Sequence, residues 1–168
     1  MIFVALGANL PSLAYGCPSS TLAAALDMLD EHRVRVIRRS RWYETAPVPM
    51  SDQPWYVNGV AEVASDLLPG ALLLALHAVE ARLGRVRSAV NAARVIDLDL
   101  LDYGGRIATD WPVLPHPRLH ERAFVLQPLR DIAPDWHHPV SGLGINAMLA
   151  RLEPGQVTRP LADQDGQP

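Results

Sequence analysis

Arg-Val-Ile-Asp-Leu-Asp-Leu-Leu-Asp-Tyr-Gly, residues 94–104, is the stretch from which the rest of the chain can be interpreted. Its aliphatic and β-branched residues, followed by a glycine pair, predict a β-strand. Because side chains alternate between the two faces of a strand, Asp97 and Asp99 should point to the same side. The opposite side should face a hydrophobic core through Ile96, Leu98 and Leu100.

Two carboxylates that lie side by side repel each other, and a divalent cation between them removes the repulsion. Mg²⁺ usually takes one or two protein carboxylates and completes its coordination with water and phosphate oxygens. The spacing of Asp97 and Asp99 therefore indicates a metal–nucleotide site. The alternative is a solvated face of an edge strand, since charged residues also protect sheet edges.

The composition limits the classes of protein to consider. The chain has 168 residues, of which 49% are hydrophobic, and this predicts one globular domain. Its net charge of -3 argues against a nucleic-acid-binding protein. No long apolar segment or basic leader is evident, so we expect a cytoplasmic protein without a membrane partner, either monomeric or dimeric.

The basic residues are all arginine, and Cys17 is the sole cysteine. A thiolate zinc cluster is thereby excluded, as are chemistries that need lysine, such as a Walker-A loop or a Schiff base. Any phosphate chemistry must use arginine, metal and backbone groups.

The order of expected elements is β-α-β-β-α-β. We expect strands at residues 2–6, 34–43, 56–64 and 94–103, and helices at 21–32 and 69–83. This order predicts an α+β, ferredoxin-like fold with an antiparallel sheet, helices on one face and C-terminal additions.

The remaining segments are expected to be less regular. Residues 45–54 contain three prolines and should form a long, functional loop. We expect a short strand at 107–110 and a short helix at 143–152. Residues 1–152 should form a single catalytic domain, and 153–168 a flexible tail.

Arginines bracket the aspartate strand. Arg85, Arg87 and Arg94 precede it, and Arg118 and Arg122 follow His116. Guanidinium groups bind phosphate oxygens in pairs, so a triphosphate with Mg²⁺ would find both signs of charge here. Ordinary solvated surface is the alternative for any single arginine.

Tyr56 and Asn58 should share a strand face directly after the proline-rich loop. A tyrosine ring can stack on a flat ring, and an asparagine can donate to and accept from it. The pair therefore suits a heteroaromatic ligand, although a half-buried strand tyrosine beside an asparagine would look the same.

Together these segments resemble the hydroxymethyl-dihydropterin pyrophosphokinase family over most of the chain, from Leu6 to about Pro134. The resemblance rests on an ordered set of motifs: Leu6-Gly-Ala-Asn-Leu10, Tyr43-Glu-Thr-Ala-Pro-Val48, Asp52-Gln-Pro-Trp-Tyr-Val-Asn58, Glu80-x-x-x-Gly-Arg-x-Arg87, the aspartate strand, Leu114-Pro-His-Pro-Arg118 and Arg122-Ala-Phe-Val-Leu-x-Pro-Leu129. An Asp-x-Asp pair alone is a weak signal, whereas this set at these spacings is specific.

The resemblance implies a ferredoxin-like, Mg²⁺-dependent enzyme of folate biosynthesis. Such an enzyme transfers diphosphate from ATP to 6-hydroxymethyl-7,8-dihydropterin and releases AMP. Two Mg²⁺ ions would bind Asp97 and Asp99, which with Arg85 and Arg94 form the expected catalytic set. The expected pterin-binding residues are Thr45, Ala46, Val48, Tyr56, Asn58 and Phe124. The expected ATP-binding residues are His77, Glu80, Arg85, Arg87, Arg94, Ile96, His116, Arg118 and Arg122.

The chain departs from the family pattern before the aspartate strand. Where Trp-Gly-Pro-Arg is common, it has Asn91-Ala92-Ala93-Arg94. The tryptophan helps to close a loop over the substrates in the family. One alternative is therefore a member that binds pterin with weak or no transfer, and another is a ferredoxin-like RNA-binding module.

Overall fold

The aspartate strand lies at one edge of an antiparallel sheet. The computed structural model describes residues 1–47, 49–85 and 93–162. Within these ranges, the sheet order is β5-β1-β4-β3-β6, and β2 also pairs with β4. The strands are β1 (Ile2–Ala8), β2 (Arg35–Arg39), β3 (Tyr43–Thr45), β4 (Tyr56–Ala64), β5 (Asp97–Tyr103) and β6 (Thr158–Pro160).

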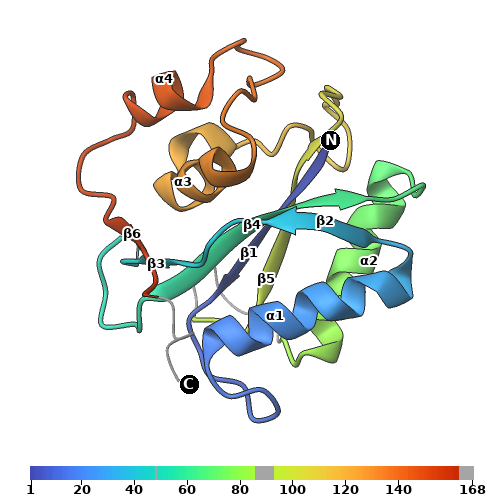
Figure 1. Cartoon of the computed structure of the whole chain (residues 1–168), viewed down its shortest axis with the longest axis vertical. Helices are drawn as coiled ribbons and strands as arrows, with labels where there is room; N and C mark the ends of the chain where they lie inside the picture. Colours follow the sequence, from blue (N-terminus) through green and yellow to red (C-terminus); the bar gives the residue numbers. More distant parts are fainter. Residues whose placement is uncertain (48, 86–92, 163–168) are drawn as a thin grey trace.

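Helices cover both faces of this sheet (Figure 1). The helices α1 (Pro18–Leu29) and α2 (Pro69–Arg82) lie on one face, and α3 (Ala123–Ile132) and α4 (Ile145–Leu149) lie on the other. Short 3-10 turns occur at Asp30–His32 and Leu119–Glu121. The α+β, ferredoxin-like prediction is confirmed, with the two core helices on one face and the C-terminal helices as additions to the other.

Alternation along β1 divides the interior into two cores. Val4 and Leu6 pack with α1 and α2, whereas Phe3 packs with α3 and α4. The prediction for the apolar side of the aspartate strand is confirmed, because Leu98 and Leu100 of β5 and the preceding residue Ile96 are all buried in the α1–α2 core. The opposite side of β5, which carries Asp97 and Asp99, is therefore free to face a site.

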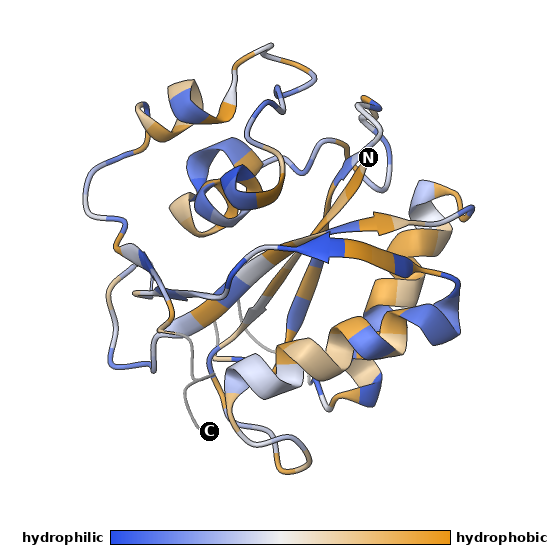
Figure 2. Ribbon diagram, in the orientation of Figure 1, coloured by the Kyte–Doolittle hydropathy of each residue, from blue (hydrophilic) through white to orange (hydrophobic). Residues whose placement is uncertain are grey.

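Three predicted elements differ from the structure in the first half of the chain. Strand β1 continues to Ala8 rather than ending at residue 6. The first helix begins at Pro18 rather than residue 21, because proline suits the first helical position. The predicted strand 34–43 is two strands, β2 and β3. Between them the Ser40 hydroxyl accepts the Val60 N–H, so a side chain interrupts the backbone ladder. The colours along β2 change from hydrophobic to hydrophilic before this break (Figure 2).

The C-terminal third holds more regular structure than the sequence predicts. Helix α3 was not expected, and residues 107–110 contribute only a bridge between Ala108 and Leu114 in place of a strand. The short helix predicted at 143–152 is present as α4. The segment predicted as a flexible tail contains β6, which pairs with β3. No helix in the described ranges has both the length and the apolar character needed to cross a bilayer.

Candidate active site

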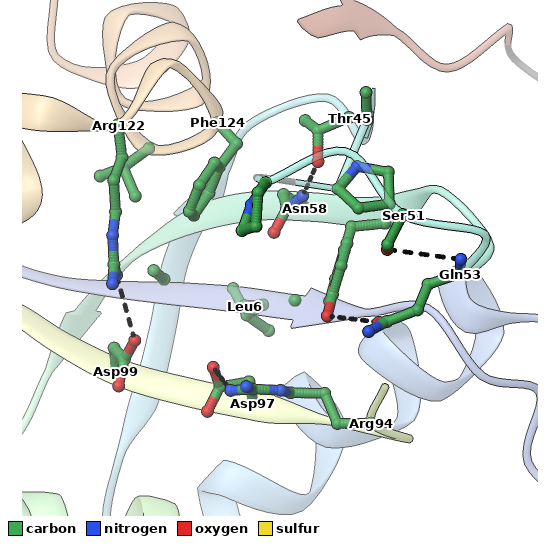
Figure 3. A pocket seen from close by; sticks show the side chains of 17 residues that line it. Leu6, Thr45, Ser51, Gln53, Asn58, Arg94, Asp97, Asp99, Arg122 and Phe124 are labelled. Atoms are coloured by element: carbon green, nitrogen blue, oxygen red, sulfur yellow. Dashed lines mark hydrogen bonds and ion pairs between the residues drawn. The ribbon is translucent and has the colours of Figure 1, made fainter. Parts of the chain in front are cut away.

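A cavity of about 200 Å³ lies between the sheet and the start of α3. Figure 3 shows Asp97, Asp99 and Arg94 along one side, Asn58 and Thr45 along the other, and Phe124 and Arg122 reaching in from the α3 side. Asp97 and Asp99 both line the cavity, as predicted from strand alternation. The acidic pair and the predicted ring-binding residues therefore share one space.

Asp97 is held by two arginines. Its Oδ1 accepts from Arg85 Nη1, and its Oδ2 accepts from Arg94 Nη1 at 2.6 Å. Arg85 Nη1 also binds Glu80 Oε1, and the same Glu80 oxygen accepts the Leu98 N–H at 2.6 Å. Through these two bonds Glu80, which is only 2% exposed, connects Arg85 to the start of β5.

Asp99 has a looser environment. Its Oδ2 lies 3.9 Å from His116 Nε2 and 3.9 Å from Arg122 Nη1, and its side chain keeps 35% of its surface exposed. Burial in the cleft and the charge of Asp97 raise the pKa of Asp99, while His116, Arg122 and Arg85 act in the opposite direction. Burial also lowers the pKa of His116.

The other end of the cavity combines amide, hydroxyl and ring groups. Asn58 Nδ2 donates to Thr45 Oγ1 at 2.7 Å, which fixes both buried side chains. The carbonyl oxygen of Asn58 projects toward the cavity (Figure 3). Tyr56 and Phe124 supply rings, and Ala46 supplies an apolar wall. This end can hold a flat, hydrogen-bonding ring.

The predicted residues fall into two groups. Lining the cavity are Thr45, Ala46, Tyr56, Asn58, Arg94, Asp97, Asp99, Arg122 and Phe124. Absent from its lining are His77, Glu80, Arg85, Ile96, His116 and Arg118. Val48 and Arg87 lie outside the described residues, as do Asn91 and Ala92 of the loop that departs from the family pattern.

The second group divides further by position. Arg85 and His116 contact the acidic pair: Arg85 forms an ion pair with Asp97, and His116 Nε2 lies 3.9 Å from Asp99 Oδ2. Arg118 is exposed and pairs with Glu121 at 3.5 Å. Ile96 is fully buried in the α1–α2 core, so it does not reach this cavity. His77 lies on α2, half-buried.

Sequence reasoning missed several lining residues, among them Ala5, Gly7, Pro47, Pro49, Ser51 and Gln53. The signal for the last four was the proline-rich loop, which we expected to be functional without naming its residues. Gly7 lies opposite Asn58 in the β1–β4 ladder. A Cβ at Gly7 would lie 2.7 Å from Asn58 Oδ1, so the absence of a side chain makes room for the amide.

The acidic pair fits a magnesium ion in its donor chemistry. Both residues offer carboxylate oxygens from the same face of one strand. Among the described residues there is no group of three or more His, Cys, Asp or Glu that could hold a metal ion. Two carboxylates alone match a site that water and substrate phosphates complete, rather than an all-protein cage.

Comparison with protein families gives one match over most of the chain. The model described as 7,8-dihydro-6-hydroxymethylpterin-pyrophosphokinase (HPPK) matches residues 3–134. This range contains every predicted site residue.

Individual relatives agree with this match. A 2-amino-4-hydroxy-6-hydroxymethyldihydropteridine pyrophosphokinase of Methylorubrum extorquens is 38% identical over 159 residues, which are 94% of this chain and 96% of that protein. One of Pseudomonas aeruginosa is 41% identical over 141 residues, 82% of this chain and 83% of the relative. The folic acid synthesis protein fol1 of Pneumocystis carinii is 36% identical over 90% of this chain, which spans only 20% of that longer protein.

A solved structure shares the fold. A crystal structure titled as HPPK-DHPS in complex with substrates superposes with a TM-score of 0.66 over 89% of this chain and 42% of that chain. At 14% sequence identity this likeness supports the fold alone.

Proposed function

The chain belongs to the 7,8-dihydro-6-hydroxymethylpterin-pyrophosphokinase family, and from this premise we propose its reaction. It transfers the terminal diphosphate of ATP to the hydroxymethyl group of 6-hydroxymethyl-7,8-dihydropterin and releases AMP, as a step of folate biosynthesis. The observation that carries the proposal is a single cavity with an Asp–Arg cluster at one end and Tyr56, Asn58 and Phe124 at the other.

The ring end of the cavity would bind the pterin. Tyr56 and Phe124 offer ring faces for stacking. The side-chain oxygen of Asn58, whose amide is fixed by Thr45, can accept a hydrogen bond from a ring N–H. A rigid arrangement of this kind directs the hydroxymethyl group toward the acidic pair, which reduces the entropic cost of reaction.

The charged end would bind the triphosphate of ATP. The hydroxyl oxygen of the pterin forms a bond to the β-phosphorus and gives its proton to water, while the bond from that phosphorus to the oxygen of AMP breaks. Arg94 and Arg122 line the cavity, where they would stabilise the negative charge that develops on the phosphate oxygens. Arg85, which is held by Glu80, orients Asp97.

Two Mg²⁺ ions, held by Asp97 and Asp99, are part of the proposal. When bound, they would neutralise phosphate charge and align the reacting oxygens. Removal of Mg²⁺ by a chelator should abolish turnover. A cytoplasmic location and a monomeric or dimeric state also remain predictions from the sequence.

The test is an assay of AMP formation. We expect AMP when ATP, Mg²⁺ and 6-hydroxymethyl-7,8-dihydropterin are all present, and none when any one is omitted. Asp97→Asn and Asp99→Asn should each lower the rate at least about a hundredfold, equivalent to about 3 kcal/mol. Asp27→Asn is the matched control, because Asp27 is exposed on α1 across the sheet. Undiminished rates in both site variants would refute the assignment.

The two alternatives predict other outcomes. A member that binds pterin without transfer would bind the ligand in calorimetry and form no AMP. An RNA-binding module would bind single-stranded RNA in a salt-dependent manner. The family match over residues 3–134 supports neither alternative.

A further inference from the structure

The chain returns to the site after α4. Residues 156–161, which we call the C-terminal strap, lie outside the range matched by the family model. In Figure 1 the chain leads from α4 along the α3 side of the sheet to the strap, whose strand β6 lies beside β3. It therefore contacts the molecule at the two elements that carry the ring end of the cavity, β3 and the start of α3.

The strap fixes β3 through its backbone. Thr45 pairs with Thr158, and the Ala46 N–H donates to the Val157 carbonyl at 3.1 Å. Arg159 Nε adds an ion pair with Glu44 Oε2 at 2.8 Å. Thr45 and Ala46 line the cavity, so these contacts support one wall from behind.

The side chain of Gln156 in the strap contacts the start of α3, which forms another wall of the cavity. Gln156 Oε1 accepts the Ala123 N–H at 2.8 Å, and Gln156 Nε2 donates to the Glu121 carbonyl at 2.9 Å. Ala123 is the first residue of α3, whose first N–H groups have no acceptor within the helix. Gln156 thus caps α3 from a distance in sequence.

The capped residue lies between two residues of the cavity. Arg122 and Phe124 directly flank Ala123, and both line the cavity. The Gln156 bonds hold the backbone on either side of Arg122, at Glu121 and at Ala123. Together with the first backbone bonds of α3, which Arg122 accepts from Val125 and Leu126, these two bonds hold the backbone from which Phe124 and Arg122 enter the cavity.

We propose that Gln156 is a positioning residue that sets the placement of Phe124 and Arg122 for pterin binding. The identity of the ligand, a pterin, rests on the proposed function, whereas the hydrogen bonds of Gln156 do not depend on it. Gln156 does not line the cavity, so it acts through α3 and the strap.

Two substitutions separate this role from general packing. Gln156→Ala removes both hydrogen bonds. Gln156→Glu keeps an oxygen for the Ala123 N–H, and a carboxylate is favourable at a helix N-terminus, but it cannot donate to Glu121. We expect the pterin dissociation constant to rise about tenfold in Gln156→Ala and less than about twofold in Gln156→Glu. Gln127→Ala is the control, because Gln127 lies on α3 and bonds only to Arg130 among the contacts described for it.

The measurements are calorimetry with the pterin on the full chain and hydrogen exchange of the Ala123 amide. Exchange should accelerate in Gln156→Ala alone, because only that variant leaves the amide without an acceptor. Unchanged pterin affinity in Gln156→Ala, or equal loss in both Gln156 variants, would overturn the proposal. A wild-type chain that forms no AMP would instead count against the proposed reaction, since neither measurement here requires turnover.

Discussion

At the scale of single residues, Asn9 connects the proline-rich loop beside the cavity to Arg94, three residues before β5 begins. Its Nδ2 donates to Gln53 Oε1 at 3.2 Å and to the Pro54 carbonyl at 3.1 Å. Its Oδ1 accepts the Arg94 N–H at 2.9 Å, and the residue is 1% exposed. Three segments distant in sequence therefore depend on one buried amide.

We predict that Asn9→Ala lowers the free energy of unfolding by about 2–3 kcal/mol, because it leaves buried polar groups without partners. Urea denaturation would measure this change. Asn146→Ala is the control, since Asn146 is exposed on α4 and its loss should stay within about 0.5 kcal/mol. Equal stability of the two variants would show that water replaces the Asn9 contacts.

Cys17 does not line the cavity, and neighbouring hydroxyl groups lower the pKa of its thiol. The hydroxyls of Ser19 and Ser20 lie 3.2 Å and 3.1 Å from its Sγ, and hydrogen bonds from Ser19 and then Ser20 lower its pKa to about 7. A lowered pKa means that the reactive thiolate persists to lower pH. The rate of alkylation by iodoacetamide should therefore reach half its maximum near pH 7, and the double variant Ser19→Ala/Ser20→Ala should shift that midpoint upward. A midpoint near 8.5 in the unmodified chain would contradict the prediction.

At the scale of elements, the sequence predicts what local patterns determine. Strand β4 matches the predicted range because polar and apolar residues alternate along it. The same pattern predicts the aspartate strand, although β5 begins at Asp97, three residues after the predicted start. Helix α3 could not be predicted in this way, because Pro128 lies inside it. Its stability comes from apolar residues that pack on the sheet, and that packing is tertiary.

The same limit applies to the site. The acidic pair followed from spacing, since two residues on one strand must share a face. The capping by Gln156 joins positions 33 residues apart, and the Asn9 bridge joins positions 85 residues apart. No local pattern reports such contacts, and they depend on the complete fold. The Ile96 prediction shows the converse, because the alternation of faces, which we predicted correctly, directs this side chain into the α1–α2 core and away from the cavity.

Strands β1 and β4 approach each other closely at Gly7 and Asn58, and a substitution can test this contact. Gly7→Ala would place a Cβ 2.7 Å from Asn58 Oδ1, and Asn58 can move only by weakening its 2.7 Å bond to Thr45. We expect the KM for the pterin to rise about tenfold, equivalent to about 1.4 kcal/mol, with little change in the KM for ATP.

Steady-state kinetics with each substrate varied in turn would test the Gly7→Ala prediction. Gly144→Ala serves as the control, because Gly144 has an ordinary φ of −72° and a Cβ there would be 3.5 Å from its nearest neighbour, His137. A rise in both KM values to the same extent would point to a general disturbance of β1 in place of a specific effect on Asn58.

At the scale of the whole molecule, one sheet separates two hydrophobic cores. The α1–α2 core belongs to the β-α-β-β-α-β unit, whereas the α3–α4 core is built largely from the C-terminal additions. The cavity lies on the α3–α4 side, with walls from β1, β3, β4, β5 and α3. The placement of its charged and ring ends therefore requires that both layers stay docked on the sheet.

A substitution of Trp136 can test how the α3–α4 layer docks on the sheet. It is 7% exposed, meets Phe3 of β1 edge to face, and donates from Nε1 to Asp102 Oδ2 of β5 at 3.1 Å. Asp102 is 2% exposed, and Trp136→Phe would leave it with only the Gly105 N–H among the hydrogen bonds described for it.

We predict that Trp136→Phe lowers the free energy of unfolding by about 2–3 kcal/mol, through lost packing and a buried carboxylate short of a partner. Trp111→Phe, at a side chain 61% exposed, should change it by less than about 0.5 kcal/mol. Urea unfolding followed by circular dichroism should give one transition in each variant, because both cores share the strands between them. For Trp136→Phe the midpoint should be lower, while the slope of the free energy of unfolding against urea concentration should be unchanged. Two separate transitions in that variant would mean that the α3–α4 layer unfolds independently of the sheet. One wall of the cavity would then come from a layer that is less stable than the sheet.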